Sequence, residues 1–160
     1  MASWNNVSLV APAFTAAVQA LFDAHKHKTM ATLRKDGSPR ISGIEADFVD
    51  GELWLGAMWQ SRKALDLQRD PRFALHSATA DADEAWRGDA RIAGRAEEVV
   101  DPERKRAVQT ASGGEAPPGP FHLFRADITD VVLVRAGDPA DHLVVEFWHE
   151  GRGLRRVERR

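Results

Sequence analysis

The sequence predicts a mainly β (α+β) fold, in which an antiparallel sheet closes into a barrel accompanied by an N-terminal helix and two short helices. Asp36-Gly37 and Asp50-Gly51 are dipeptides typical of tight hairpin turns, and strand-like segments follow one another instead of alternating with helices. Closure into a barrel removes the exposed edges of such a sheet. With 160 residues, of which 43% are hydrophobic, we expect one domain over residues 1–160.

The first element is an amphipathic helix, predicted from Pro12 to Lys26. Pro12 stands near its start, where the missing N–H costs nothing, and the basic residues 25–28 have the sign that a helix C-terminus prefers. The apolar residues at helical spacing are Phe14, Ala17, Val18, Leu21 and Phe22.

The rest of the chain consists of strands with two short helices between them. Residues 61–71 are predicted as a helix that Pro71 stops, and residues 101–110 as a helix capped by Asp101. Residues 110–120 are rich in Gly and Pro and predict a mobile loop, placed as a lid over the substrate side. The predicted strands are a hairpin over 29–48 and the segments 52–59, 72–79, 84–100, 121–136, 141–150 and 151–159.

Composition excludes several classes of protein. The net charge of -2 gives no basic field for nucleic acid, and the Arg-rich tail at 152–160 is interrupted by Glu158 and lacks aromatic residues for base stacking. The absence of cysteine excludes disulfides, thiolate catalysis and cysteine zinc sites. The six histidines show no HExxH-like spacing, so no metal site is predicted. Without a signal peptide or a long apolar run, we expect a cytoplasmic protein with no membrane partner.

Ser61, Arg62 and Lys63 form a local conflict. They follow a strand and open a helix, with Ser61 as the predicted N-cap. The first turn of a helix favours acidic side chains, because its free N–H groups carry partial positive charge, yet two cations stand there. A bound phosphate would resolve the conflict, and the alternative is that both side chains point into water.

Three motifs carry a resemblance to a known family: Ser61-Arg62-Lys63, Asp70-Pro71-Arg72 and Glu146-Phe147-Trp148. On these motifs, over roughly residues 12–160, the chain resembles the pyridoxamine 5′-phosphate oxidase-like, FMN-binding split-barrel superfamily, in particular its small single-domain members. The resemblance implies an antiparallel split β-barrel that binds FMN, or alternatively the deazaflavin coenzyme F-420, at a homodimer interface.

The same resemblance implies a set of cofactor-binding residues from both subunits. These are Ser42, Gly43, Ile44 and Glu45 beside the ring and ribityl chain, Gly56, Ala57 and Met58 on the neighbouring strand, Ser61, Arg62 and Lys63 at the phosphate, and Trp148 and Arg159 from the partner subunit.

The chain also departs from the true oxidases of the superfamily. Their insertion with substrate-binding residues is replaced by ERKRAVQTASGG at 103–114, and the chain has no tyrosine. Their C-terminal Arg-x-His pair reads Arg155-Arg156-Val157. The resemblance therefore does not extend to vitamin B6 oxidation.

Two functions remain open at this point. One is a flavin- or deazaflavin-dependent oxidoreductase that acts on a small organic substrate, and the other is a protein that binds a flavin, a deazaflavin or haem without turnover. No catalytic residue is identified, because in such a site the hydride chemistry belongs to the cofactor.

Overall fold

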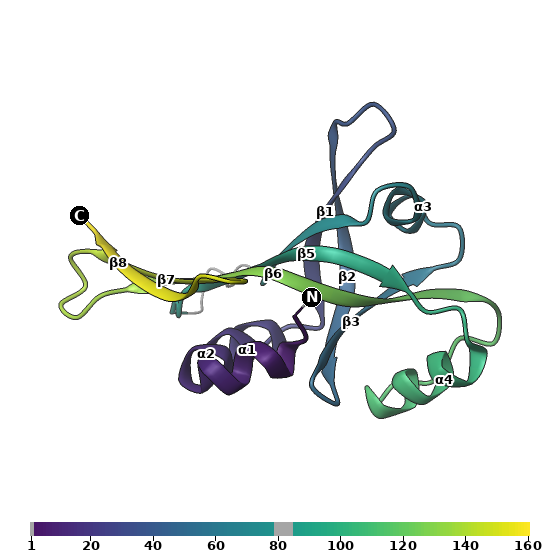
Figure 1. Ribbon diagram of the computed structural model, residues 1–160, viewed down its shortest axis with the longest axis horizontal. Helices are drawn as coiled ribbons and strands as arrows, with labels where there is room; N and C mark the ends of the chain where they lie inside the picture. Colours follow the sequence, from purple (N-terminus) through teal and green to yellow (C-terminus); the bar gives the residue numbers. More distant parts are fainter. Residues whose placement is uncertain (1, 79–84) are drawn as a thin grey trace.

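The computed structural model describes residues 2–78 and 85–160, and antiparallel strands make up most of this part of the chain (Figure 1). The fold prediction is confirmed. The strands of the structure are β1 (His27–Leu33), β2 (Pro39–Val49), β3 (Glu52–Met58), β4 (Arg72–His76), β5 (Asp89–Glu98), β6 (Phe121–Ala136), β7 (Leu143–His149) and β8 (Gly153–Arg159). Its helices are α1 (Trp4–Val10), α2 (Pro12–Asp23), α3 (Arg62–Arg69) and α4 (Pro102–Ala111).

Six strands close the barrel in the order β3-β2-β1-β4-β5-β6, and β6 returns to pair with β3. Leu55 of β3 lies opposite Phe124 of β6 in this closing pair. The inward side chains fill the barrel, and Met30, Leu55, Ile92 and Phe124 are almost completely buried. Closure leaves the barrel without a free edge, which is the physical reason for expecting it.

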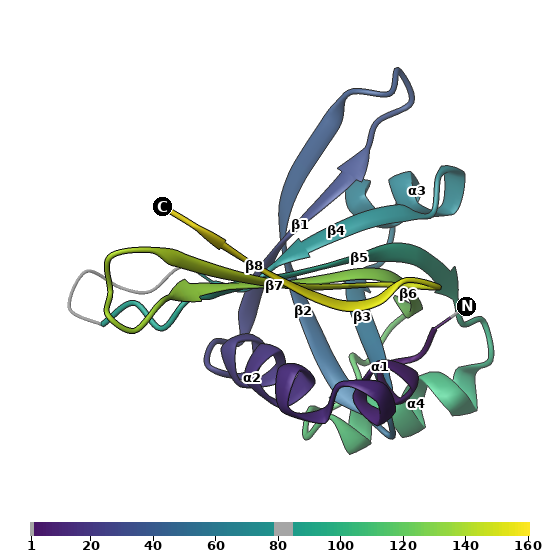
Figure 2. The same cartoon turned by 60° about the vertical axis from the view of Figure 1, so that its left-hand side comes forward.

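β6 is 16 residues long and pairs with β5 along most of its length, whereas on its other side its two halves pair with different strands. The first half closes the barrel, whereas the second half, from Asp130 onward, pairs with β7. Between them the β5–β6 register shifts at Ala93/Gly94. A Cβ at Gly94 would collide with the carbonyl oxygen of Asp127, so this close approach requires glycine. Beyond the bulge, β7 and β8 leave the barrel as a hairpin arm (Figures 1 and 2).

The hairpin turns occur where the sequence predicts them. Asp50 and Gly51 both have positive φ, 51° and 75°, as a type I′ turn requires. The turn fixes the register of β2 against β3, in which Val49 lies opposite Glu52. This register decides which residues of the two strands face each other farther along.

The N-terminal helices differ from the prediction in two respects. α1 was not predicted, although Ser3 and Asn6 form a capping box at its start. The predicted helix over 12–26 ends at Asp23, because the following residues join the sheet: His27 pairs with Glu45 in β1. Sheet pairing overrides the helical pattern there. Both helices pack against the barrel, where Trp4 contacts Phe48 at a ring distance of 4.6 Å.

The two short helices are confirmed, with α3 directly after β3 and α4 capped by Asp101, whose side chain accepts from two backbone N–H groups. α4 includes Thr110 and Ala111, so the predicted loop begins two residues later than expected. The predicted strands 72–79 and 84–100 are β4 and β5 with shorter bounds, and their residues 79 and 84 lie outside the described residues. Within residues 2–78 and 85–160, every helix is too short or too polar to cross a membrane.

Candidate cofactor site

The candidate site lies where β2 and β3 separate. Glu45 and Gly56 are the last residues that pair between these strands, so Gly43 and Ile44 on one side and Met58 on the other lie beyond the ladder. A cavity of about 300 Å³ opens there. It is lined by His27, Gly43, Ile44, Glu45, Gly56, Ala57, Met58, Lys63, Gln109, Pro117 and Phe121.

Glycines keep the cavity open. A Cβ added at Gly43 or at Gly56 would meet no atom within 4 Å, so neither position is filled by neighbouring groups. Glu45 lies on β2, two residues after Gly43 and opposite Gly56. Its carboxylate lies 3.3 Å from the Lys26 ammonium. The cavity therefore has a small-residue floor and one acidic side chain that is already paired with a cation.

Lys63 connects this cavity to the start of α3. Its ammonium donates a hydrogen bond to the Gly43 carbonyl, and burial lowers the pKa of Lys63. Arg62 is exposed and has no ion pair or hydrogen bond among the described residues. The first turn of α3 contains no acidic residue. Two cations thus stand at a helix N-terminus without a carboxylate partner.

Ser61 adds an unsatisfied polar atom to the same place. It holds the N-cap position with extended backbone, as predicted, but its side chain makes no capping hydrogen bond. The Ser61 hydroxyl oxygen is buried and has no hydrogen-bond partner within the described residues. An anion with several oxygen atoms would accept from this hydroxyl, from the free N–H groups of α3 and from the two cations.

The middle of α3 is anchored by a buried carboxylate. Asp66 is 3% exposed and accepts from Thr32 at 2.8 Å, Arg40 at 2.6 Å and Arg69 at 2.9 Å. Burial raises the pKa of Asp66, but these hydrogen bonds more than offset it and hold the pKa below its usual value. Asp66 ties α3 to β1 and β2, and so fixes the helix beside the cavity.

Most of the predicted site residues come together here. Seven line the cavity, and Ser61 and Arg62 stand at the adjoining helix start. Ser42 lies on β2 next to Gly43 but does not line the cavity. The residues that line it without being predicted are His27, Gln109, Pro117 and Phe121.

These four residues carried little sequence signal. Pro117 belongs to the loop predicted as a lid, and its place in the lining agrees with that position, while the loop's mobility stays a prediction. Phe121 opens the strand β6, and Gln109 lies on α4, next to this loop. Only their shared position at one end of the barrel brings them to the cavity.

Trp148 and Arg159 lie on the hairpin arm, away from this cavity. Trp148 is 6% exposed and lines a separate groove of about 240 Å³ together with Phe147, Arg152 and Arg155. Arg159 is exposed and pairs with Leu143, five positions along β7 from Trp148. That both contact a cofactor from the partner subunit stays a prediction.

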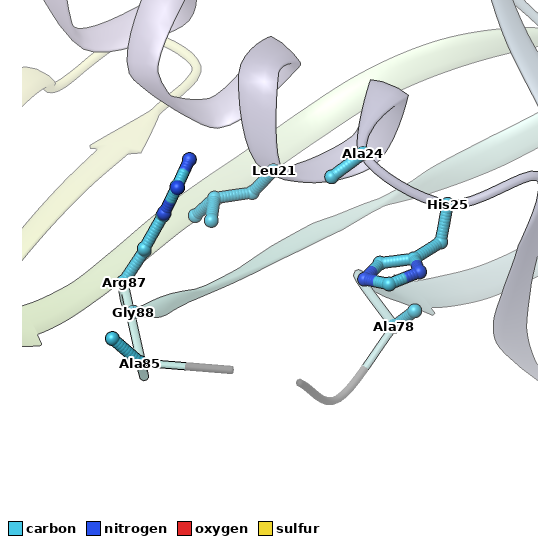
Figure 3. Close-up of a pocket in the computed structure, with 7 residues that line it drawn as sticks. All are labelled: Leu21, Ala24, His25, Ala78, Ala85, Arg87 and Gly88. Atoms are coloured by element: carbon cyan, nitrogen blue, oxygen red, sulfur yellow. The ribbon is translucent and has the colours of Figure 1, made fainter. Parts of the chain in front are cut away.

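A third cavity, of about 230 Å³, lies at the end of α2 (Figure 3). Leu21, Ala24 and His25 line it from one side, and Arg87 and Gly88 from the other. It contains none of the predicted site residues. Among the described residues no group of three or more His, Cys, Asp or Glu side chains could hold a metal ion.

Comparison with known proteins identifies the fold and the family. Residues 14–135 match the family model described as pyridoxamine 5′-phosphate oxidase. No curated protein matches the chain.

Solved structures with the same fold include proteins of different kinds, among them three that are each under 20% identical to this chain. PhzG from Burkholderia lata, in complex with tetrahydrophenazine-1-carboxylic acid, has 16% identity and a TM-score of 0.63, and the match covers 97% of this chain and 92% of PhzG. A haem-binding protein from Mycobacterium smegmatis has 17% identity and a TM-score of 0.58, with coverage of 90% and 87%. An F420 reductase has 17% identity and a TM-score of 0.54, with coverage of 71% and 94%. These likenesses show the fold.

Proposed function

Because the chain belongs to the pyridoxamine 5′-phosphate oxidase family, which its match over residues 14–135 shows, we propose that it binds a flavin-type cofactor in the cavity between β2 and β3. The observation that carries the proposal is the start of α3. Arg62 and Lys63 have no carboxylate partner there, and the Ser61 hydroxyl is buried without a hydrogen-bond partner among the described residues. A phosphate satisfies all three groups.

The residues of the cavity suit the remainder of such a cofactor. Gly43 and Gly56 leave room over the separated strands, and Ile44, Ala57 and Met58 offer apolar contact. The Gly43 carbonyl also accepts a hydrogen bond from Lys63. Lys63 would therefore lie between the phosphate and the ring of the bound cofactor. When bound, the cofactor supplies two-electron transfer to or from a small organic substrate, and the chain supplies binding and orientation.

FMN and the deazaflavin coenzyme F-420 both fit this proposal. Each has a ring, a ribityl chain and a phosphate, and the contacts proposed here are directed at the phosphate. The family contains oxidoreductases, so we propose an oxidoreductase that uses one of these two cofactors.

We propose further that the functional unit is a homodimer. Three large apolar side chains near the cavity are exposed to solvent: Ile41 at 75%, Met58 at 81% and Trp59 at 52%. Exposure of several large apolar side chains close to one site supports an interaction surface there. The resemblance to the family implies that Trp148 and Arg159 of the second copy would contact the cofactor in such a dimer.

The test is a titration of FMN and of coenzyme F-420 against the wild type, Arg62→Ala and Lys63→Ala. A charge-assisted hydrogen bond contributes about 1.5–3 kcal/mol, so each substitution should weaken binding by about one to two powers of ten. Lys35→Ala removes an exposed cation from the β1–β2 turn and should leave affinity unchanged. Equal affinity for the wild type and both site variants would place the phosphate elsewhere. Binding without turnover of any electron acceptor would make the chain a binding protein.

A further inference from the structure

The turn that leads into α3 is held from behind by a buried histidine. His122 on β6 is 1% exposed, and its Nε2 accepts a hydrogen bond from the backbone N–H of Gln60 at 3.2 Å. Its ring stacks on Trp59 with a centroid distance of 4.6 Å and an interplanar angle of 11°. His122 therefore contacts the two residues that immediately precede Ser61.

Gln60 needs such support. Its φ is 57°, in the left-handed region that side-chain-bearing residues seldom adopt. The reversal at Gln60 takes the chain out of β3 and into α3, where Ser61 N–H donates to the Met58 carbonyl. A hydrogen bond to the Gln60 amide offsets the cost of this conformation and fixes the direction in which α3 starts.

Glu98 sets the orientation of the histidine ring. Its carboxylate lies 2.6 Å from His122 Nδ1 and also accepts from Gln68 of α3 at 2.8 Å. Burial raises the pKa of Glu98, but the bonds from Gln68 and His122 more than offset it, so the pKa is lowered and Glu98 is ionised at neutral pH. An ionised carboxylate accepts a hydrogen bond from Nδ1–H, which keeps the ring proton on Nδ1 and leaves Nε2 as the acceptor for the Gln60 N–H.

We infer that His122 is a positioning residue for the cofactor phosphate: by holding the Gln60 amide, it fixes Ser61, Arg62 and Lys63 in the arrangement that a phosphate requires. The inference rests on the proposed function, because it concerns the same phosphate position. His122 does not touch the cavity itself and acts through the turn. The Glu98–His122–Gln60 chain connects β5, β6 and the start of α3, which are far apart in sequence.

The decisive variant is His122→Phe, which keeps a ring against Trp59 and removes both nitrogen atoms. The readout is the ratio of the riboflavin Kd to the FMN Kd, since riboflavin lacks the phosphate. We expect this ratio to fall about tenfold while the riboflavin Kd stays constant. Coenzyme F-420 and its phosphate-free ribityl core provide the same comparison if the deazaflavin is the cofactor bound.

Two further variants separate positioning from packing. His122→Gln places an amide oxygen near the position of Nε2, where it can accept from Gln60, so it should retain the wild-type ratio. Phe124→Leu removes the ring that stacks next to His122 at a centroid distance of 6.1 Å, but keeps both nitrogen atoms of His122. It should lower thermal stability without changing the ratio. A fall in the ratio for Phe124→Leu equal to that for His122→Phe would overturn the inference.

A structural readout needs no cofactor. In the wild type, nitrogen NMR should find His122 protonated at Nδ1 only, and the Gln60 amide should exchange slowly with solvent. Exchange of that amide should accelerate at least about tenfold in His122→Phe, because the N–H loses its acceptor. A wild-type His122 protonated at Nε2 overturns the inference even if His122→Phe does not fold.

The outcomes also distinguish this inference from the proposed function. If wild type and Arg62→Ala show no preference for the phosphate-bearing cofactors, the phosphate site itself is wrong, whatever His122 does. If wild type prefers them and Arg62→Ala loses the preference, but His122→Phe keeps both the preference and slow Gln60 exchange, the site stands and the role of His122 is refuted.

Discussion

The first and second turns of helix α3 satisfy their charges in opposite ways. In its second turn, Asp66 is buried and bonded to three donors, two of which, Thr32 and Arg40, come from outside the helix. At the N-terminus, Arg62 has no polar partner among the described residues, and Lys63 reaches only a backbone carbonyl. One helix of eight residues thus contains a fully compensated anion and two uncompensated cations.

This difference separates what holds the fold from what serves a ligand. The Asp66 contacts are complete within the chain, so they stabilise the fold whether or not anything is bound. The cations stand against the positive end of the helix dipole, which costs free energy in the chain alone. Arg62 and Lys63 lower the stability of the free protein and lie at one site. Such a cost indicates a ligand whose negative charge compensates the two cations when it binds.

The largest effect should come from Asp66→Ala. This substitution leaves the buried Thr32 hydroxyl and the partly buried Arg40 without their acceptor. Removing one partner of a buried ion pair should lower the free energy of unfolding by about 3 kcal/mol. Urea unfolding checks this, with Asp70→Ala, which breaks the more exposed pair with Arg72, as the matched control for a lost carboxylate. Equal losses for both variants would contradict the anchoring role of Asp66.

The same anchor should be visible in acid. The pKa of Asp66 is lowered in the fold, so its stabilisation is present above the unfolded value of about 3.9 and is lost as pH falls through the folded pKa. Asp66→Asn cannot titrate there. The difference in unfolding free energy between wild type and Asp66→Asn should therefore stay constant from pH 7 to about 5 and shrink as the pH falls below about 4. A difference that stays constant below about pH 4 as well would show that the ionised carboxylate is not what stabilises.

A smaller loss is expected from Thr32→Val. Thr32 is 1% exposed and donates to Asp66 at 2.8 Å. Valine keeps the shape and removes the donor, so the free energy of unfolding should fall by about 1 kcal/mol. Chemical denaturation measures it, and the Thr32→Val and Asp66→Ala losses should not add in the double variant, since the two residues share one hydrogen bond. Additive losses would mean that the two side chains act independently.

The smallest effect has the opposite sign. Arg62→Ala removes a cation from the N-terminus of α3, and without cofactor the variant should be more stable than wild type by about 0.3–1 kcal/mol at low ionic strength. Added salt should reduce the gain, because it screens the helix dipole. Differential scanning calorimetry of the cofactor-free protein decides it. A clear loss of stability would show that Arg62 has a structural partner.

The sequence predicts features that depend on neighbouring residues. A few adjacent residues determine the geometry of a turn and the charge at a helix end. The sequence therefore predicts the turns at Asp36-Gly37 and Asp50-Gly51, and the two cations at the positive end of α3. α1 is not predicted because its seven residues are too few to show a clear helical pattern. The predicted end of α2 is wrong because pairing of β1 with β2 determines where the helix stops.

Contacts between distant segments have no such signal. Gln60 and His122 are 62 positions apart, and only closure of the barrel through β3 and β6 brings them together. The same closure places Phe121 opposite Met58 at the cavity. Trp148 and Arg159 were predicted from resemblance alone, and their proposed role depends on a second copy of the chain.

The most direct test of the proposed ligand role of the α3 cations is to measure the thermal unfolding of wild type and Arg62→Ala with and without cofactor. The cofactor used is whichever of FMN and coenzyme F-420 binds wild type. Cofactor in excess stabilises by RT ln(1 + [L]/Kd), so a tenfold weaker Kd reduces the stabilisation by about 1.4 kcal/mol. We predict that Arg62→Ala melts no lower than wild type alone but gains clearly less from the cofactor. An equal gain for both proteins would show that the cations at the start of α3 do not bind the phosphate.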